Sequence, residues 1–231
     1  MAGRVVVVTG GAGGLGQGVT RVLVARGFRV VVPTPGDEWV AQARAAVGDV
    51  ADVRDVDAGD PGAMGRLAEE LGADGEPWAL VHLMGGYHDG DPVATMDLDA
   101  WDGQFALNAR GTVVAMRAFL PGMVARGGGR VVAVSSRAAV RPFAGAAAYA
   151  ASKAAVIALV GAAAEEVKGN GVTVNCVVPS VIDTPANRSA SPDADPGRWV
   201  APRELGEVIA FLVSEAGSGI TGAALPVYGR V

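Results

Sequence analysis

Short runs rich in valine alternate with longer segments of helical character along this chain of 231 residues. The run 5–8 is four valines in a row, and apolar side chains on both faces are typical of a parallel-sheet strand covered by helices on each side. The alternation predicts an α/β, doubly wound Rossmann fold, with a seven-stranded, mostly parallel sheet and helices on both faces. The expected strands are 5–8, 28–32, 50–56, 79–83, 130–134, 172–178 and 225–228. The expected helices are 15–26, 38–46, 61–71, 99–125, 149–167 and 202–214.

No linker or change of composition divides the chain, so residues 1–231 are expected to form a single domain. The longest apolar run, 154–164, is too short to cross a bilayer. The N-terminus turns glycine-rich without the apolar stretch of a secretory signal. We therefore expect a cytoplasmic protein that does not enter a membrane.

Charge and residue usage exclude several kinds of partner. A net charge of -5 predicts no basic surface for a nucleic acid. Cys176 is the only cysteine, which excludes a disulfide within the chain and a cysteine-based zinc site. The two histidines, His82 and His88, are too few to build a metal site alone. The expected partner is a small molecule, and no metal is expected.

Glycines cluster directly after the first expected strand. In VVVVTGGAGGLGQGV, Gly10, Gly14 and Gly16 lie between the valines and a helix that starts near Leu15. Glycines there let the backbone turn sharply, and they let a pyrophosphate approach the free N–H groups at the positive end of the helix. A turn needed only for packing is the alternative, but the position between strand and helix favours dinucleotide binding.

A tyrosine and a lysine interrupt an alanine-rich segment. Lys153 follows Tyr149 by one helical turn, so the ammonium group is expected beside the phenol. A neighbouring cation favours the ionised phenol and lowers its pKa from about 10 toward neutral pH, where it serves as acid or base. Ser136 follows the expected strand 130–134, at the edge where open sheets bind ligands. The alternative is an aromatic residue packed in the helix face beside a snorkelling lysine.

The order and spacing of these motifs resemble the short-chain dehydrogenase/reductase family over essentially the whole chain. The glycine pattern G-x-x-x-G-x-G is preceded by Thr9, and Ser136, Tyr149 and Lys153 meet the pattern of Ser followed by Tyr-x-x-x-Lys. The resemblance implies an NAD- or NADP-dependent oxidoreductase that transfers a hydride between the cofactor and a small-molecule carbonyl or alcohol. It also implies a fourth catalytic residue, Asn108, which in relatives kinks a helix and holds a water in a proton relay. A helix-interior asparagine bonded to a nearby carbonyl is the alternative.

The same resemblance assigns the residues that bind the cofactor. It places the Ile182 backbone and the Thr184 hydroxyl at the nicotinamide carboxamide, and Asp57 at the adenine, although Asp57 equally suits a cap for the next helix. Where relatives have N-N-A-G the chain reads HLMG, of which Gly85 still matches, and proline–serine replaces proline–glycine after the sixth strand. The implied cofactor-binding residues are Thr9, Gly10, Gly14, Leu15, Gly16, Thr34, Asp57, Gly85, Tyr149, Lys153, Pro179, Ile182 and Thr184.

Cofactor choice depends on the end of the second strand. Thr34 stands at the position that reads the ribose, where it can bond either cofactor, and Gly13 offers no basic side chain. Asp37 and Glu38 follow within one turn, and their charge disfavours a 2′-phosphate. The sequence therefore favours NAD over NADP, unless Asp37 merely caps the helix that begins there.

Further expectations concern substrate and assembly. Segment 184–201 is rich in Pro, Ala and Asp with little helical period, so we expect a mobile substrate lid, with a plain surface loop as the alternative. Segments 182–199 and 84–87 look like those of quinonoid dihydropteridine reductase, which leaves pterin reduction open, as does a dinucleotide-binding sensor without turnover. That reductase lacks the serine found at Ser136, which favours carbonyl chemistry here. Family resemblance implies a homotetramer or homodimer that pairs through the two longest helices.

Overall fold

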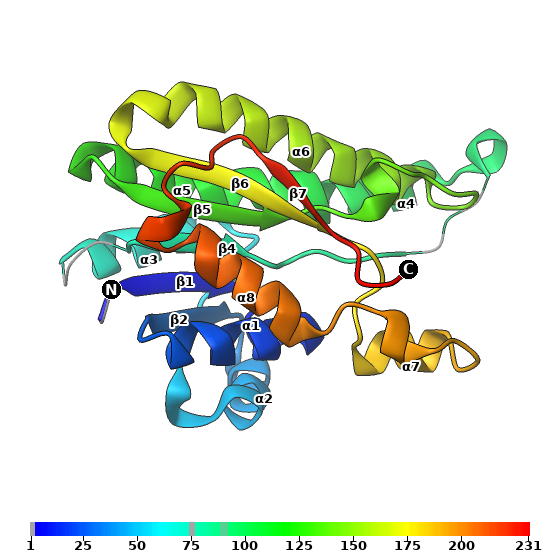
Figure 1. The fold of residues 1–231 in the computed structure, drawn as a ribbon, viewed down its shortest axis with the longest axis horizontal. Coiled ribbons are helices and arrows are strands. Elements are labelled where there is room, and N and C mark those ends of the chain that lie inside the picture. Colours follow the sequence, from blue (N-terminus) through cyan, green and yellow to red (C-terminus); the bar gives the residue numbers. More distant parts are fainter. Residues whose placement is uncertain (1–2, 74–76, 89, 91) are drawn as a thin grey trace.

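The computed structural model describes residues 3–73, 77–88, 90 and 92–231, and its strands form one sheet between two layers of helices (Figure 1). The strands are β1 (Val5–Thr9), β2 (Arg29–Thr34), β3 (Asp52–Asp55), β4 (Ala79–His82), β5 (Gly129–Val134), β6 (Val172–Pro179) and β7 (Ala224–Val227). They lie in the order β3-β2-β1-β4-β5-β6-β7, and every neighbouring pair is parallel. The expected doubly wound fold is confirmed, and its sheet is wholly rather than mostly parallel.

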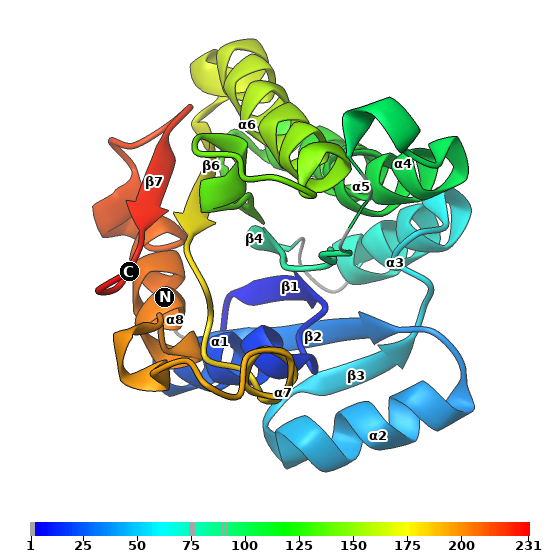
Figure 2. The same ribbon diagram turned by 90° about the vertical axis from the view of Figure 1, so that its right-hand side faces the viewer.

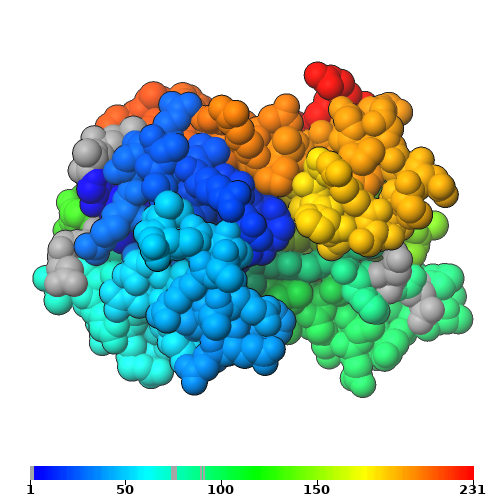
Figure 3. All heavy atoms as spheres, turned by 90° about the horizontal axis from the view of Figure 1, so that it is seen from below, coloured from blue at the N-terminus to red at the C-terminus, as the bar shows by residue number. Residues whose placement is uncertain are grey.

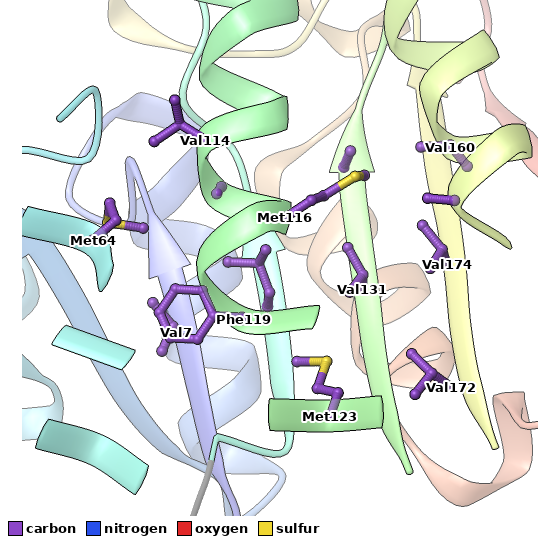
Figure 4. Packing of buried hydrophobic residues seen from close by; sticks show 14 of the residues in the cluster. Val7, Met64, Val114, Met116, Phe119, Met123, Val131, Val160, Val172 and Val174 are labelled. Atoms are coloured by element: carbon purple, nitrogen blue, oxygen red, sulfur yellow. The ribbon is translucent and has the colours of Figure 1, made fainter. Parts of the chain in front are cut away.

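Helices cover both faces of the sheet. They are α1 (Gly14–Ala25), α2 (Asp37–Val47), α3 (Pro61–Ala73), α4 (Leu98–Phe105), α5 (Gly111–Arg126), α6 (Ala147–Val167), α7 (Pro185–Ala190) and α8 (Pro202–Leu212). Figures 1 and 2 show α1, α2 and α8 on one side and α3, α5 and α6 on the other. The valine runs supply both layers because successive side chains of a strand point to opposite faces. Val6 and Val8 join the core under α1 and α8, whereas Val7 joins the core with Phe119 of α5, part of which Figure 4 shows.

The expected helix 99–125 is divided into three parts. α4 ends at Phe105, a π-helical turn (Ala106–Arg110) follows, and α5 begins at Gly111. The expectation of one continuous helix was wrong here, because the ladder of helical hydrogen bonds widens by one residue. Such π turns occur often at functional sites, and Asn108 lies within this one.

The expected lid, 184–201, holds more regular structure than its composition indicated. It contains α7 and a 3-10 turn (Pro196–Arg198), and a bridge between Ile182 and Val200 closes its base. Thr184 caps α7, since its Oγ1 accepts a hydrogen bond of 3.2 Å from the Asn187 N–H. Figure 3 shows the segment, in yellow and orange, beside the N-terminal part of the chain, in blue.

α6 begins two residues before the helix expected at 149–167, ends with it, and extends beyond the apolar run 154–164 at both ends. With the turn that follows it, 147–170, it is the one helix among the described residues that is long and apolar enough, by length and composition, to cross a membrane. The expectation based on 154–164 was therefore wrong about length. In this fold the helix packs on the sheet, with Val156 and Val160 in the same buried cluster as Val174 of β6.

Candidate active site

The glycine loop joins β1 to α1 with the backbone packed too tightly for side chains. Gly10 has a φ of +70°, and a Cβ on Gly16 would lie 2.0 Å from the Gly10 carbonyl oxygen. No side chain caps α1, whose N-cap is Gly13, so the N–H groups of its first turn remain available to an anion. A Cβ on Gly14 would lie 3.0 Å from Thr184 Cβ, which brings the base of the 184–201 segment against this loop.

Thr9 lies behind the loop rather than on its surface. It is fully buried, and its Oγ1 is 2.8 Å from Nδ1 of His82 on the next strand. Burial, together with the charge of Lys153, lowers the pKa of His82 to about 3, so its imidazole is neutral. Thr9 therefore supports the glycine loop from the protein interior, and His82 is a core residue paired with Thr9.

Ser136 and Tyr149 meet at the carboxyl end of β5. Tyr149 lies in the first turn of α6, and its phenol is hydrogen bonded to the Ser136 side chain. Burial raises the pKa of Tyr149 above its ordinary value, while the Ser136 hydrogen bond acts in the opposite direction. The expectation that the neighbouring cation lowers this pKa was wrong, because desolvation of the phenol dominates. The phenol is therefore protonated at neutral pH.

Lys153 is buried one turn further along α6. It is 5% exposed, and its Nζ donates a hydrogen bond of 3.0 Å to the Val134 carbonyl. Burial lowers the pKa of this lysine to about 8. A Cβ on Gly85 would lie 2.7 Å from Lys153 Nζ and 2.8 Å from Asn108 Oδ1, so only glycine fits beside both groups. The retained Gly85 of the HLMG stretch thus makes room for the lysine.

Asn108 holds the loop after β4. Its Oδ1 accepts a hydrogen bond of 3.0 Å from the Gly86 N–H, and its Nδ2 donates to the Gly86 carbonyl at 3.1 Å and to Ser152 Oγ at 3.0 Å. Its own carbonyl accepts a hydrogen bond of 2.7 Å from Thr112 Oγ1. The side chain therefore ties the loop after β4 to α6. Its hydrogen bond to the Gly86 carbonyl is of the kind that the alternative interpretation, a helix-interior asparagine bonded to a nearby carbonyl, expects.

A cavity of about 740 Å³ opens at this edge of the sheet. Of the residues that the sequence assigned, seven line it: Leu15, Gly85, Ser136, Tyr149, Lys153, Pro179 and Ile182. Asn108 does not line it, but its side chain is hydrogen bonded to Gly86, which does, and to Ser152. No cluster of three or more metal-ligating side chains occurs within the described part of the chain.

Residues 4–195 match the model of the family described as short chain dehydrogenase. The chain belongs to the short-chain dehydrogenase/reductase family. It is 33% identical over 239 residues to the cis-4-hydroxycyclohexanecarboxylate dehydrogenase of Sinomonas cyclohexanicum, with 99% of this chain and 96% of that protein covered. It is 31% identical over 242 residues to the 2,5-dichloro-2,5-cyclohexadiene-1,4-diol dehydrogenase LinX of Sphingobium indicum, with the same coverage of 99% and 96%. A solved structure of an actinorhodin polyketide ketoreductase variant with NADPH superposes with a TM-score of 0.88 at 28% identity, covering 99% of this chain and 98% of that one.

Membership confirms the resemblance seen in the sequence. This dehydrogenase is accordingly an NAD(P)-dependent oxidoreductase that acts on alcohol or carbonyl groups. The relatives' matches span nearly the full length of both chains, so the family likeness covers both the glycine loop and the segment that holds Ser136, Tyr149 and Lys153.

The adenine end of the expected cofactor site is open and acidic. Asp57 Oδ1 accepts a hydrogen bond of 2.7 Å from the Gly59 N–H, and it is Asp60 that caps α3, with Oδ1 2.6 Å from the Gly62 N–H. The alternative in which Asp57 caps that helix was therefore wrong. Asp37 stands in the first turn of α2, whose N-cap makes no side-chain hydrogen bond, so Asp37 does not serve as its cap either.

The cavity also contains residues that sequence reasoning missed. Tyr87, Arg137, Arg141, Phe143 and Asn187 all line it. The sequence held a signal for the arginines, because they follow Ser136 in the connection after β5, at the edge where parallel sheets bind ligands. The aromatic residues carry no comparable pattern.

Proposed function

We propose that this dehydrogenase interconverts a small cyclic ketone and its secondary alcohol, with Tyr149 as the group that gives and takes the proton. The meeting of Ser136, Tyr149 and Lys153 in one cavity, at the carboxyl edge of the sheet, carries the proposal. Two relatives are named for cyclic alcohols, which supports a ring as the substrate skeleton.

A bound nicotinamide cofactor supplies or accepts the hydride. The residues present fit such a group: the first turn of α1 offers free N–H groups for a pyrophosphate, and Gly16 leaves the backbone bare beside Gly10. Leu15 and Ile182 line the same cavity as Ser136, Tyr149 and Lys153. An ammonium group has three donors, and Val134 takes one from Lys153, which leaves donors for a ribose.

Tyr149 enters the reduction as a protonated phenol, since burial raises its pKa. A carbonyl oxygen seated between the Ser136 and Tyr149 hydroxyl groups receives a hydrogen bond from each, and the phenol proton passes to it as negative charge develops. In the oxidation the phenolate takes the proton back from the alcohol. Lys153 carries its charge below a pKa of about 8 and stabilises that phenolate. Asn108 is a positioning residue that fixes the loop against which Lys153 lies.

The two alternative functions are less well supported. A serine that holds a substrate oxygen suits carbonyl chemistry better than pterin reduction. A sensor without turnover has no use for a buried phenol hydrogen bonded to that serine.

We further propose a preference for NAD over NADP. Thr34 ends β2 without a basic neighbour in sequence, and the Gly36 N–H donates a hydrogen bond of 2.6 Å to Asp55 Oδ1, which adds a third carboxylate to those of Asp37 and Glu38. Arg54, on the adjacent strand β3, directs its guanidinium to Asp52, with Nε 2.9 Å from Oδ1. A 2′-phosphate would meet a predominantly acidic surface.

The exposed face of α6 bears on how the protein assembles. Ala154, Ala158 and Ala162 are exposed at intervals of one turn along α6, and small residues permit close helix pairing. We propose a homodimer or homotetramer through this face in the cytoplasm. Light scattering at micromolar concentration should show it, and Ala158→Arg should yield monomers. A monomeric wild type would contradict the assignment.

The proposed lid is testable by limited proteolysis. If 184–201 closes over substrate, cutting in this segment should slow when cofactor and a ketone analogue are bound together. Equal cutting rates would make it an ordinary surface loop.

The catalytic proposal is tested with a panel of cyclic ketones and Tyr149→Phe. The wild type should oxidise reduced cofactor with at least one ketone, and Tyr149→Phe should lower turnover by about two orders of magnitude or more with cofactor affinity nearly unchanged. Tyr228→Phe, a tyrosine outside the cavity lining, is the matched control. A Tyr149→Phe variant within threefold of wild type would remove this phenol from the mechanism.

A further inference from the structure

The cavity has an unusual balance of charge for this protein. Three cationic side chains line it, Lys153, Arg137 and Arg141, and among the residues that the structure describes no aspartate or glutamate does. The chain as a whole carries a net charge of -5. Field lines from one sign of charge concentrate in a cleft with low-dielectric walls and attract ligands of the opposite sign. The proposed roles of Lys153 account for one of these cations, but the two arginines are still without a function.

The two arginines lie next to each other. The Arg141 N–H donates a hydrogen bond of 2.8 Å to the Arg137 carbonyl, which holds the two residues one turn of the backbone apart, and both line the cavity. Arg137 is steadied by Tyr228, whose ring centroid is 5.5 Å from its Cζ. Like charges at this spacing repel, and an anion between them would remove the cost.

Neither arginine forms an ion pair with any carboxylate in the described residues. Arg188 provides the contrast, because it lies in the same region and holds Asp183 through two contacts of 2.5 and 2.8 Å. The two N–H groups of a guanidinium match the two oxygens of a carboxylate. Two guanidinium groups that pair with no carboxylate of the protein are what a site for an anionic ligand requires.

Aromatic rings line the cavity together with the arginines and the catalytic hydroxyl groups. Tyr87 packs edge-on against Tyr149 with ring centroids 5.0 Å apart, and the Phe143 ring centroid lies 6.2 Å from that of Tyr87. Phe143 is 55% exposed and Tyr87 49% exposed, which leaves apolar surface for a ligand to cover. A flat or alicyclic ring fits this surface, with its carbonyl toward Tyr149.

We propose that the substrate is a cyclic ketone or alcohol that bears a carboxylate, bound by Arg137 and Arg141 while the carbonyl oxygen lies against Ser136 and Tyr149. This inference rests on the proposed function and names the substrate class of that same cavity. The arginines belong to the connection between β5 and α6, whereas the glycine loop follows β1, and β4 lies between these two strands. A pyrophosphate on the glycine loop therefore meets other groups.

The decisive experiment compares an acid with its neutral ester. The probes are 4-oxocyclohexanecarboxylate and its methyl ester, with the ratio of their kcat/KM values as the readout. The wild type should favour the acid by about tenfold or more, and Arg137→Met and Arg141→Met should each lower the ratio about tenfold, mainly through KM for the acid. Arg66→Met, an exposed arginine of α3 away from the cavity, should leave the ratio unchanged. High salt should reduce the preference of the wild type.

Three results would overturn the inference. The first is a wild-type ratio near one, the second is an equal loss for acid and ester in the arginine variants, and the third is an effect confined to the KM of the cofactor. Binding of benzoate against benzamide, measured by calorimetry with oxidised cofactor present, separates this inference from the proposed function. If no ketone is turned over but benzoate binds about tenfold more tightly through Arg141, the proposed reaction fails and the anion site stands. If ketones are turned over and benzoate binds no better than benzamide, the anion site fails alone.

Discussion

Among the described residues, cationic side chains pair with a carboxylate at the amino end of the sheet, whereas those that line the cavity at its carboxyl end do not. At the amino end, two guanidinium groups lie over the Trp78 ring, with Arg4 Cζ 3.7 Å and Arg130 Cζ 4.7 Å from its centroid. Arg4 also contacts Glu215 at 2.6 Å, and the buried Arg130 reaches Glu215 at 3.4 Å and the Gly129 carbonyl at 2.8 Å. At the carboxyl end, the cations of the cavity form no ion pair with a carboxylate in the described part of the chain.

This difference in pairing distinguishes cations that stabilise the fold from cations that serve function. Charges that are paired and hydrogen bonded hold the fold together, and their loss leaves buried groups without partners. Charges left unpaired at the edge where ligands bind lower stability, and they are retained for what they bind. Substitutions at the amino end should therefore change stability, and substitutions at the carboxyl end should change catalysis.

The largest expected effect is at Lys153. Lys153→Met should lower turnover on the order of a thousandfold, because the phenolate loses its neighbouring cation, and it should also weaken cofactor binding. Steady-state kinetics and a cofactor titration check the two effects. Lys168→Met is the matched control, since Lys168 is the only other lysine and pairs with Glu165 at the surface. Unchanged cofactor affinity would leave Lys153 with the proton chemistry alone.

A paired cation at the opposite end should give the reverse result. Arg130→Met should destabilise the fold by about 2 kcal/mol, roughly thirtyfold in the unfolding constant, with turnover close to wild type. Chemical denaturation measures the loss, and Arg203→Met, which removes an exposed pair with Glu207, should change stability far less. A catalytic defect in folded Arg130→Met would break the division between the two ends.

Substitution of His82 tests whether this buried, neutral imidazole contributes to stability. Its pKa is lowered from 6.5 to about 3 in the folded protein, so the unfolded chain takes up the proton first as the pH falls. The stability that comes from keeping this group neutral is fully present above pH 6.5. Below that pH the unfolding constant rises by up to about tenfold per pH unit. His82→Asn should flatten this part of the stability profile, whereas His88→Asn, at an exposed position, should not. Identical slopes for wild type and His82→Asn would show that this histidine is not buried as a neutral group.

The smallest expected effect is cofactor choice. The wild type should favour NADH over NADPH by about tenfold in kcat/KM at fixed ionic strength, the effect of a partly solvated like-charge contact. Asp37→Ala should reduce the ratio. A wild type that prefers NADPH, or a ratio that Asp37→Ala leaves unmoved, would contradict the acidic-surface argument.

Sequence reasoning performed best where one physical rule dominates. Valine runs with no polar face indicated buried parallel strands, and a glycine cluster between strand and helix located a loop that the structure packs without room for a Cβ at Gly16. The spacing of Tyr149 and Lys153 placed both on one turn of α6.

It performed worst where tertiary packing decides. The π turn around Asn108 leaves no mark in a helical pattern, and α7 forms in a segment of low helical period after Thr184 supplies a cap. The pKa of Tyr149 was expected to fall because only the neighbouring charge was counted, whereas burial is known only from the fold. Thr9 was open to prediction, because the alternation of β1 places it on the same face as the buried Val7.

Transfer of a deuteride tests the central claim most directly. A reduced cofactor deuterated at its hydride-donating carbon should be incubated with wild-type enzyme and 4-oxocyclohexanecarboxylate, and the product analysed by mass spectrometry. The account predicts a hydroxy acid with one deuterium on the carbinol carbon, and almost none formed by Tyr149→Phe in the same time. An enzyme that binds the cofactor yet gives no deuterated alcohol from this or any other cyclic ketone would contradict it.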